Sequence, residues 1–145
     1  MQYRQATPQD LQTAIDLCLL LWPHCTREEL ENNEELDLTN PDNAIFLAFD
    51  EETAAAFANC SLRHDYVEGT DSNPVGYLEG IYVRPEYRGR GAARALVSLC
   101  EDWSRARGCA EFASDCELDN TDSLRFHLKI GFDEVNRVIC FTKEL

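Results

Sequence analysis

The stretch Arg88-Gly89-Arg90-Gly91-Ala92-Ala93 decides how this chain is interpreted. It follows a segment that ends Val83-Arg84-Pro85, and it leads into a helix that we predict over residues 91–107. A glycine-rich turn at a helix N-terminus presents several free backbone N–H groups and the positive end of the helix dipole. Such a turn binds anions, and a pyrophosphate suits it well. We therefore expect a phosphate-binding loop here.

The charge of the chain supports this interpretation. The protein has 145 residues and a formal net charge of −14, yet four of its 13 basic residues lie close together around the turn: Arg84, Arg88, Arg90 and Arg94. The turn lacks the Gly-Lys-Ser/Thr ending of a Walker A loop, and Arg94 stands where a Rossmann fingerprint needs its third glycine. A solvated basic turn is the alternative, but the preceding strand and the long following helix favour phosphate binding.

The remaining pattern mixes α and β elements in a single domain over residues 1–145. Apolar spacing and capping residues predict helices over 8–22, 26–36, 91–107 and 120–130. Strands are predicted over Gln2–Gln5, Ala44–Phe49, Ala54–His64, Pro74–Val83, Cys109–Ser114 and Val135–Thr142.

Glu79 and Gly80 interrupt the apolar strand predicted over Pro74–Val83. A glycine inside a strand often marks a bulge or a close approach to a ligand. Positions where local rules fail are candidate functional sites, so we expect one here.

These features together resemble the GCN5-related N-acetyltransferase (GNAT) superfamily. Val83-Arg84-Pro85 precedes the loop, Arg88, Gly91 and Ala93 fill its fixed positions, and Asn120 stands at the superfamily's interval before Gly131-Phe132. The resemblance implies an α/β (α+β) fold in one N-acetyltransferase domain, with a mixed, mostly antiparallel central sheet flanked by helices. It implies acetyl-CoA as co-substrate, bound by Ile81, Tyr82, Val83, Arg88, Gly89, Arg90, Gly91, Ala92, Ala93 and Asn120.

A closer resemblance is to the short bacterial aminoglycoside 6′-N-acetyltransferases. It rests on Leu21-Trp22-Pro23, Leu62–Val67, Leu78–Ile81, Ala113–Asp115 and Glu134–Ile139. It implies transfer of acetyl to the 6′-amino group of an aminoglycoside, antibiotic resistance and a homodimer. The acceptor site would consist of Trp22, Tyr66, Glu79 and Asp115, with Asn136 contributing where these enzymes often have an acidic residue.

Three residues are candidates for proton transfer. Glu79 is the preferred general base, directly or through a water, because a carboxylate can both bind an ammonium and take its proton. Asp115 ends a predicted strand and could bind the ammonium or share the base role, or it could be an ordinary turn residue. His127 stands where many superfamily members have a tyrosine that donates to the thiolate; a packed helix histidine is the alternative.

Composition narrows the partners. The acidic charge disfavours nucleic acid and anionic lipid and favours a polycation. Seven cysteines without CxxC spacing predict neither a disulfide framework nor a metal site, and the chain has no signal-peptide pattern or long apolar run, so we expect a cytoplasmic protein.

No Cys/His pair indicates a covalent route, which favours direct attack in a ternary complex. Two alternatives stay open: an acetyltransferase for another amine, such as a polyamine or a protein amino group, and a non-catalytic acetyl-CoA-binding module.

Overall fold

The computed structural model describes residues 1–145 and contains one five-stranded sheet of order β1-β2-β3-β4-β5. Strands β1 to β4 pair with one another in antiparallel fashion, and β5 pairs with β4 in parallel. The mixed, mostly antiparallel sheet expected from the sequence is thereby confirmed. The strands are β1 (Gln2–Gln5), β2 (Asn43–Asp50), β3 (Thr53–Arg63), β4 (Val75–Val83) and β5 (Phe112–Ser114).

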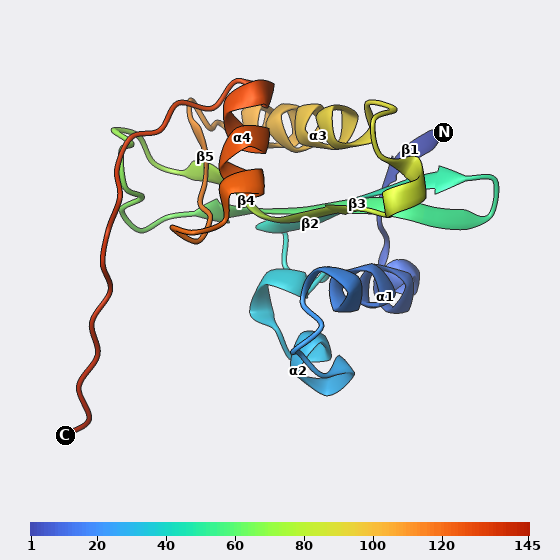
Figure 1. Ribbon diagram of the computed structural model, residues 1–145, viewed down its shortest axis with the longest axis horizontal. Helices are drawn as coiled ribbons and strands as arrows, with labels where there is room; N and C mark the ends of the chain where they lie inside the picture. Colours follow the sequence, from blue (N-terminus) through green and yellow to red (C-terminus); the bar gives the residue numbers. More distant parts are fainter.

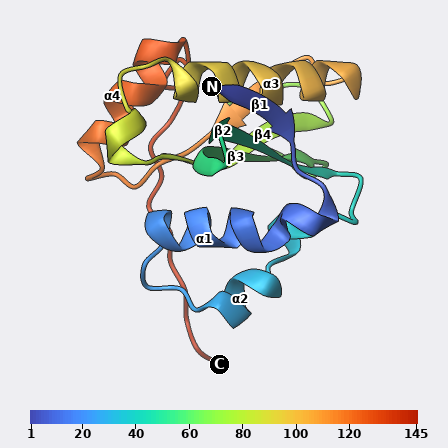
Figure 2. The same ribbon diagram turned by 90° about the vertical axis from the view of Figure 1, so that its right-hand side faces the viewer.

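Helices cover both faces of the sheet and make three layers (Figures 1 and 2). α3 (Ala92–Ala106) and α4 (Thr121–Ile130) lie on one face, whereas α1 (Leu11–Leu21) and α2 (Arg27–Glu31) lie on the other. Short 3-10 turns precede α1, follow α2 and follow β4: η1 (Pro8–Asp10), η2 (Glu34–Leu36) and η3 (Pro85–Tyr87). None of the helices has the length and apolar character that crossing a membrane would require.

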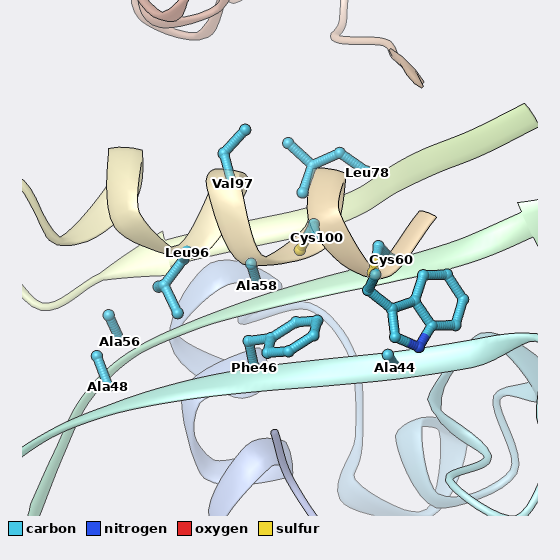
Figure 3. Close-up of a cluster of buried hydrophobic side chains, with 11 residues drawn as sticks. Ala44, Phe46, Ala48, Ala56, Ala58, Cys60, Leu78, Leu96, Val97 and Cys100 are labelled. Atoms are coloured by element: carbon cyan, nitrogen blue, oxygen red, sulfur yellow. The ribbon is translucent and has the colours of Figure 1, made fainter. Parts of the chain in front are cut away.

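Strand alternation determines which side chains reach each helix layer. On one face, α3 buries Leu96 and Cys100 against Ala58 and Cys60 of β3 (Figure 3). On the opposite face, Phe57 of β3 packs into the cluster formed with α1. Residues 59, 61 and 63 follow Phe57 at a spacing of two, so the polar end of β3 belongs to the α1 face.

Two predicted elements differ in extent from those observed. The helix predicted over 26–36 divides into α2 and η2, because the Asn33 side chain accepts a hydrogen bond from the backbone N–H of Glu35 and starts a new turn. The strand predicted over Cys109–Ser114 begins only at Phe112. The N–H of Cys109 instead donates to the carbonyl of Ser104, 3.1 Å away, and closes the turn after α3.

The terminal strand predicted over Val135–Thr142 is wrong for the single chain. Residues 132–145 form no helix or strand, and the segment extends away from the body of the protein (Figure 1). Its first part lies against the loop after β3, where the Asn136 amide donates to Glu68 and Val135 packs beside Gly69. The alternating apolar residues favour an extended chain, but a strand also needs a partner edge, and this segment has none.

Candidate active site

The glycine turn before α3 has the geometry expected of a phosphate-binding loop. Gly89 and Gly91 have φ angles of +76° and +84°, and no atom lies within 4 Å of where a Cβ would stand on either residue. Gly91 is the N-cap residue of the 15-residue α3, and no side chain caps this end of the helix. The backbone N–H groups of the first turn therefore stay free for an anion, which fits the pyrophosphate of CoA.

Two arginines fasten this loop to the ends of neighbouring strands. Arg88 donates from Nε to the carbonyl of Val83 at 2.9 Å, and its guanidinium lies over the Tyr82 ring. Arg84 donates from Nε to the carbonyl of Ala54 at 2.8 Å. Arg90 is exposed beside the glycines, so positive charge surrounds the turn.

The sheet opens immediately before this loop. β5 pairs only with Gly76, Tyr77 and Leu78, so residues 79–83 of β4 have β3 on one side and no strand on the other. The register of β3 and β4 shifts between Asn59 and Cys60, which leaves Glu79 as the extra, unpaired residue. The bulge expected at Glu79-Gly80 is confirmed. Beyond the bulge, the backbone N–H groups of β4 that point away from β3 have no strand to bond to, so they can polarise a carbonyl in the opening.

The side chain of Glu79 is only 5% exposed and accepts three hydrogen bonds from β3. Ser61 donates from Oγ to Oε1 at 2.6 Å, while Arg63 donates from Nε to Oε1 at 2.9 Å and from Nη2 to Oε2 at 2.7 Å. Ser61 and Arg63 are two residues apart, so strand alternation presents both on the same face of the sheet.

A continuous chain of contacts joins Glu79 to Asp115. The guanidinium carbon of Arg63 lies 3.5 Å from the centroid of the Tyr77 ring. The hydroxyl of Tyr77 in turn donates to Oδ2 of Asp115, directly after β5. Burial raises the pKa of Tyr77, and the hydrogen bond to Asp115 raises it further, so the phenol remains a donor at neutral pH. The two carboxylates predicted from sequence thus belong to one cluster.

Residues between α1 and β2 complete the acceptor side. Trp22, directly after α1, packs edge-on against Phe57, and its indole lies where it would clash with a Cβ on Gly80. Burial raises the pKa of Glu35 on η2, and the negative charges of Glu79 and Asp115 add to this shift. Glu35 itself is an exposed residue, but it lies close enough to both carboxylates for their charges to act on it, so it is a third acidic group beside the cluster. Sequence reasoning missed it because it lies in the helix predicted over 26–36, where no motif marks it as part of a site.

His127 occupies a hydrogen-bonded position on α4. Its Nδ1 lies 2.7 Å from the carbonyl oxygen of Ser123, and its Nε2 lies 2.8 Å from Oγ of Ser114 on β5. A carbonyl can only accept, so Nδ1 carries a proton. The imidazole also packs against the ring of Phe132, as the alternative of a packed helix histidine expects, and its role as a proton donor stays a prediction. Asn120, predicted to bind the cofactor, caps α4 by accepting from the N–H of Ser123 at 3.1 Å.

Two predicted acceptor residues lie outside this cluster. Tyr66 is 76% exposed in the loop after β3, and Asn136 bonds to Glu68 in the same region. Neither takes part in the contacts that join Glu79 to Asp115. The structure adds Ser61, Arg63 and Tyr77 instead, and their only sequence signal is the spacing of two along paired strands. No three His, Cys, Asp or Glu side chains are grouped as metal ligands.

An anion-binding turn, an opened sheet and a buried carboxylate are the parts of an acyl-CoA-dependent transferase. The chain belongs to the acetyltransferase (GNAT) family, whose model matches residues 9–132. It is 43% identical to the aminoglycoside N(6′)-acetyltransferase type 1 of Stenotrophomonas maltophilia, over 98% of this chain and 92% of that protein. The corresponding enzyme of Salmonella enteritidis is 41% identical, over 99% of both chains.

Solved structures agree with this relationship. Aminoglycoside acetyltransferase AAC(6′)-Iy, in complex with the bisubstrate analogue CoA-S-monomethyl-acetylneamine, superposes with a TM-score of 0.93 at 38% identity. The match covers 99% of this chain and 98% of that chain. The acetyltransferase fold expected from the sequence is confirmed over the full length.

Proposed function

We propose that this protein is an acetyl-CoA-dependent N-acetyltransferase that acetylates the 6′-amino group of aminoglycosides. The observation that carries the proposal is the full-length similarity to aminoglycoside N(6′)-acetyltransferases. The geometry supports it, because an acidic cluster suited to a polycation lies beyond the bulge from a loop suited to the CoA pyrophosphate.

Glu79 and Asp115 divide the work on the acceptor amine. The amine arrives as an ammonium and must lose a proton before its nitrogen attacks the acetyl carbonyl carbon. Glu79 is the general base, directly or through one water, because three donors hold its carboxylate in place inside the site. Asp115 binds the ammonium and is oriented by Tyr77. Trp22 provides an aromatic surface beside them.

Backbone groups serve the donor. Gly89, Gly91 and the first turn of α3 hold the pyrophosphate of acetyl-CoA, with Arg88 and Arg90 beside it. Those N–H groups of Ile81–Val83 that point away from β3 stabilise the negative charge that develops on the carbonyl oxygen. As the new C–N bond forms, the C–S bond breaks and CoA leaves as a thiolate, in a ternary complex without an acyl-enzyme.

His127 is the proton source for the thiolate. Its Nδ1 proton is held by Ser123, so Nε2 is the position that gains and loses a proton. Ser114 bonds to this nitrogen and stands on β5, at the edge of the opening in the sheet. Protonated Nε2 can therefore pass a proton towards the sulfur, directly or through the Ser114 hydroxyl.

A thiol-release assay tests the proposal. Acetyl-CoA with kanamycin or tobramycin should release free thiol at a rate proportional to enzyme concentration. Turnover with spermidine or a peptide and none with a panel of aminoglycosides would instead favour an acetyltransferase for another amine. Binding of CoA without turnover on any amine would identify a non-catalytic module.

We also propose a homodimer, in which the extended segment 132–145 pairs with a second copy. Ile139 and Phe141 are 77% and 90% exposed in the single chain, and β5 has an open outer edge of three residues. Light scattering after gel filtration should give twice the chain mass. A double variant, Ile139→Asp with Phe141→Asp, should give the monomer mass; a monomeric wild type would contradict the pairing.

We place the protein in the cytoplasm and assign it a role in antibiotic resistance. All seven cysteines are free, and five of them are partly or fully buried, which suits a reducing compartment. Acetylation removes one positive charge from the drug, so bacteria that express the wild type should tolerate more tobramycin than bacteria that express Glu79→Gln. Equal tolerance would contradict the assigned role.

A further inference from the structure

Arg63 is the one basic side chain that bonds to the carboxylate of Glu79. Its side chain is 38% exposed, whereas that of Glu79 is 5% exposed, so the arginine covers the carboxylate from the solvent side. Its guanidinium presents two parallel donors, the arrangement that binds a carboxylate most specifically.

The contacts leave little freedom for the carboxylate. A carboxylate has about four lone-pair positions. Arg63 and Ser61 together use three of them, two on Oε1 and one on Oε2. One position, on Oε2, is not used by these donors, so an acceptor amine that bonds to this carboxylate would bond there.

The arginine also sets the charge balance around Glu79. The charged and titratable groups that face Glu79 are Arg63 on β3, Tyr77 on β4, Glu35 on η2 and Asp115 after β5. The hydrogen bonds to Glu79 raise the pKa of Arg63, so the arginine is always charged. Two of the other groups are acidic, and Arg63 is the single cation among them.

We infer that Arg63 is a positioning residue: it holds the Glu79 carboxylate in one orientation and places a single positive charge against it, which leaves one position on Oε2 for the acceptor amine. The inference rests on the proposed function. Arg63 acts through Glu79, and its stacking on Tyr77 extends the same control to the residue that orients Asp115.

A second arginine in this protein offers a matched control. Arg4 forms a two-pronged ion pair with Asp10 at 2.8 Å for both contacts, and its guanidinium lies over the Phe49 ring. It stands on β1, which is separated from β4 by two strands. The pair has the chemistry of the Arg63 pair but no access to the site.

The experiment compares Arg63→Met, Arg63→Lys and Arg4→Met in the full chain, with kcat and KM for tobramycin measured from pH 5 to pH 9. Arg63→Met should lower kcat about tenfold to a hundredfold, because the base is no longer held in place. The acceptor KM should not rise, since a repelling cation has been removed. The acid limb of the kcat/KM profile should move to higher pH by about one unit.

Arg63→Lys should separate the two effects. Lysine keeps the positive charge, so the acid limb should stay near that of the wild type. It lacks the two parallel donors of the guanidinium, so kcat should still fall. Arg4→Met should change stability alone. A second measurement needs no substrate and is made only on protein that is shown to be folded: a ¹³C NMR titration of the Glu79 carboxyl carbon in wild type, Arg63→Lys and Arg63→Met.

An acid limb that stays unmoved in Arg63→Met, or a loss of activity that appears only as a raised KM, would overturn the inference. A Glu79 carboxyl that titrates identically whether position 63 is Arg, Lys or Met would overturn it as well. Failure of the proposed function looks different: the wild type itself would release no thiol with any aminoglycoside, while the titration would still report on Arg63.

Discussion

The donor side and the acceptor side of this site are built from different parts of the polypeptide. The proposed donor side is a run of consecutive residues from Arg88 to Ala93, and the groups proposed to bind CoA are backbone N–H groups made accessible by two glycines with positive φ. The acceptor side gathers side chains from β3, β4, η2 and the segment after β5. Contacts between these side chains, rather than the path of the backbone, give the acceptor side its shape.

This difference teaches where specificity can change. A backbone site depends on conformation, so it tolerates most exposed side-chain substitutions and fails where a glycine is lost. A site made of side chains depends on each charge and each partner, so single isosteric substitutions alter it. We therefore expect acceptor preference to vary with few mutations while donor binding stays constant.

The largest effect should come from Glu79→Gln. The amide keeps the shape of the side chain but cannot take a proton, so kcat/KM for tobramycin should fall about 10²–10⁴-fold. CoA affinity, measured by calorimetry, should stay unchanged, because the donor side does not use this group. Glu52→Gln, in the exposed turn between β2 and β3, is the control and should retain wild-type activity. A fully active Glu79→Gln enzyme would contradict the role of Glu79 as the general base on the acceptor side.

Next in size is Gly91→Val, which targets the donor side alone. A β-branched residue at φ +84° costs about 1–3 kcal/mol in backbone strain, so the loop should shift and the acetyl-CoA KM should rise about tenfold or more. Gly108→Val is the matched control, since Gly108 has φ +85° and open space around it at the far end of α3. It should lower the melting temperature similarly and leave the acetyl-CoA KM as it was.

A smaller effect is expected from Asp115→Asn on the acceptor side. The amide oxygen can still accept from Tyr77, but the negative charge is lost. The acceptor KM should rise about threefold to tenfold, and the acetyl-CoA KM should not change. Asp133→Asn, exposed after α4, removes an equal charge outside the site. If both substitutions raise the acceptor KM equally, only the net charge of the protein matters and the cluster does not.

The smallest effect should be that of Glu35→Gln, and it should depend on pH. Burial and its acidic neighbours raise the pKa of Glu35, so it loses its charge at a higher pH than an ordinary glutamate does. At pH 8 the substitution should raise the acceptor KM about threefold, and the ratio to wild type should shrink towards one as the pH falls to 5. Glu34→Gln is the control. A ratio that grows at low pH would contradict the assigned environment.

The sequence predicted the backbone conformation around the proposed donor side, while the binding of CoA there stays a prediction. The loop, the bulge at Glu79 and the start of α3 all depend on local backbone preferences of glycine and proline, which short motifs carry. It could not predict the partnership of Glu79 with Arg63, because that contact depends on the register between β3 and β4. The sequence also could not predict the structure of Val135–Thr142, because alternating apolar residues favour an extended chain but do not identify a strand edge for it to pair with.

The most direct test of the account is the acetylation of two aminoglycosides that differ at one position, one with an amine and the other with a hydroxyl at carbon 6′. The account predicts rapid thiol release from acetyl-CoA with the 6′-amine, a product with acetyl on that nitrogen, and at least a hundredfold slower release with the 6′-hydroxyl compound, on the order of the loss expected when the reacting group is missing. Equal rates with both compounds, or no thiol release with either, would contradict it.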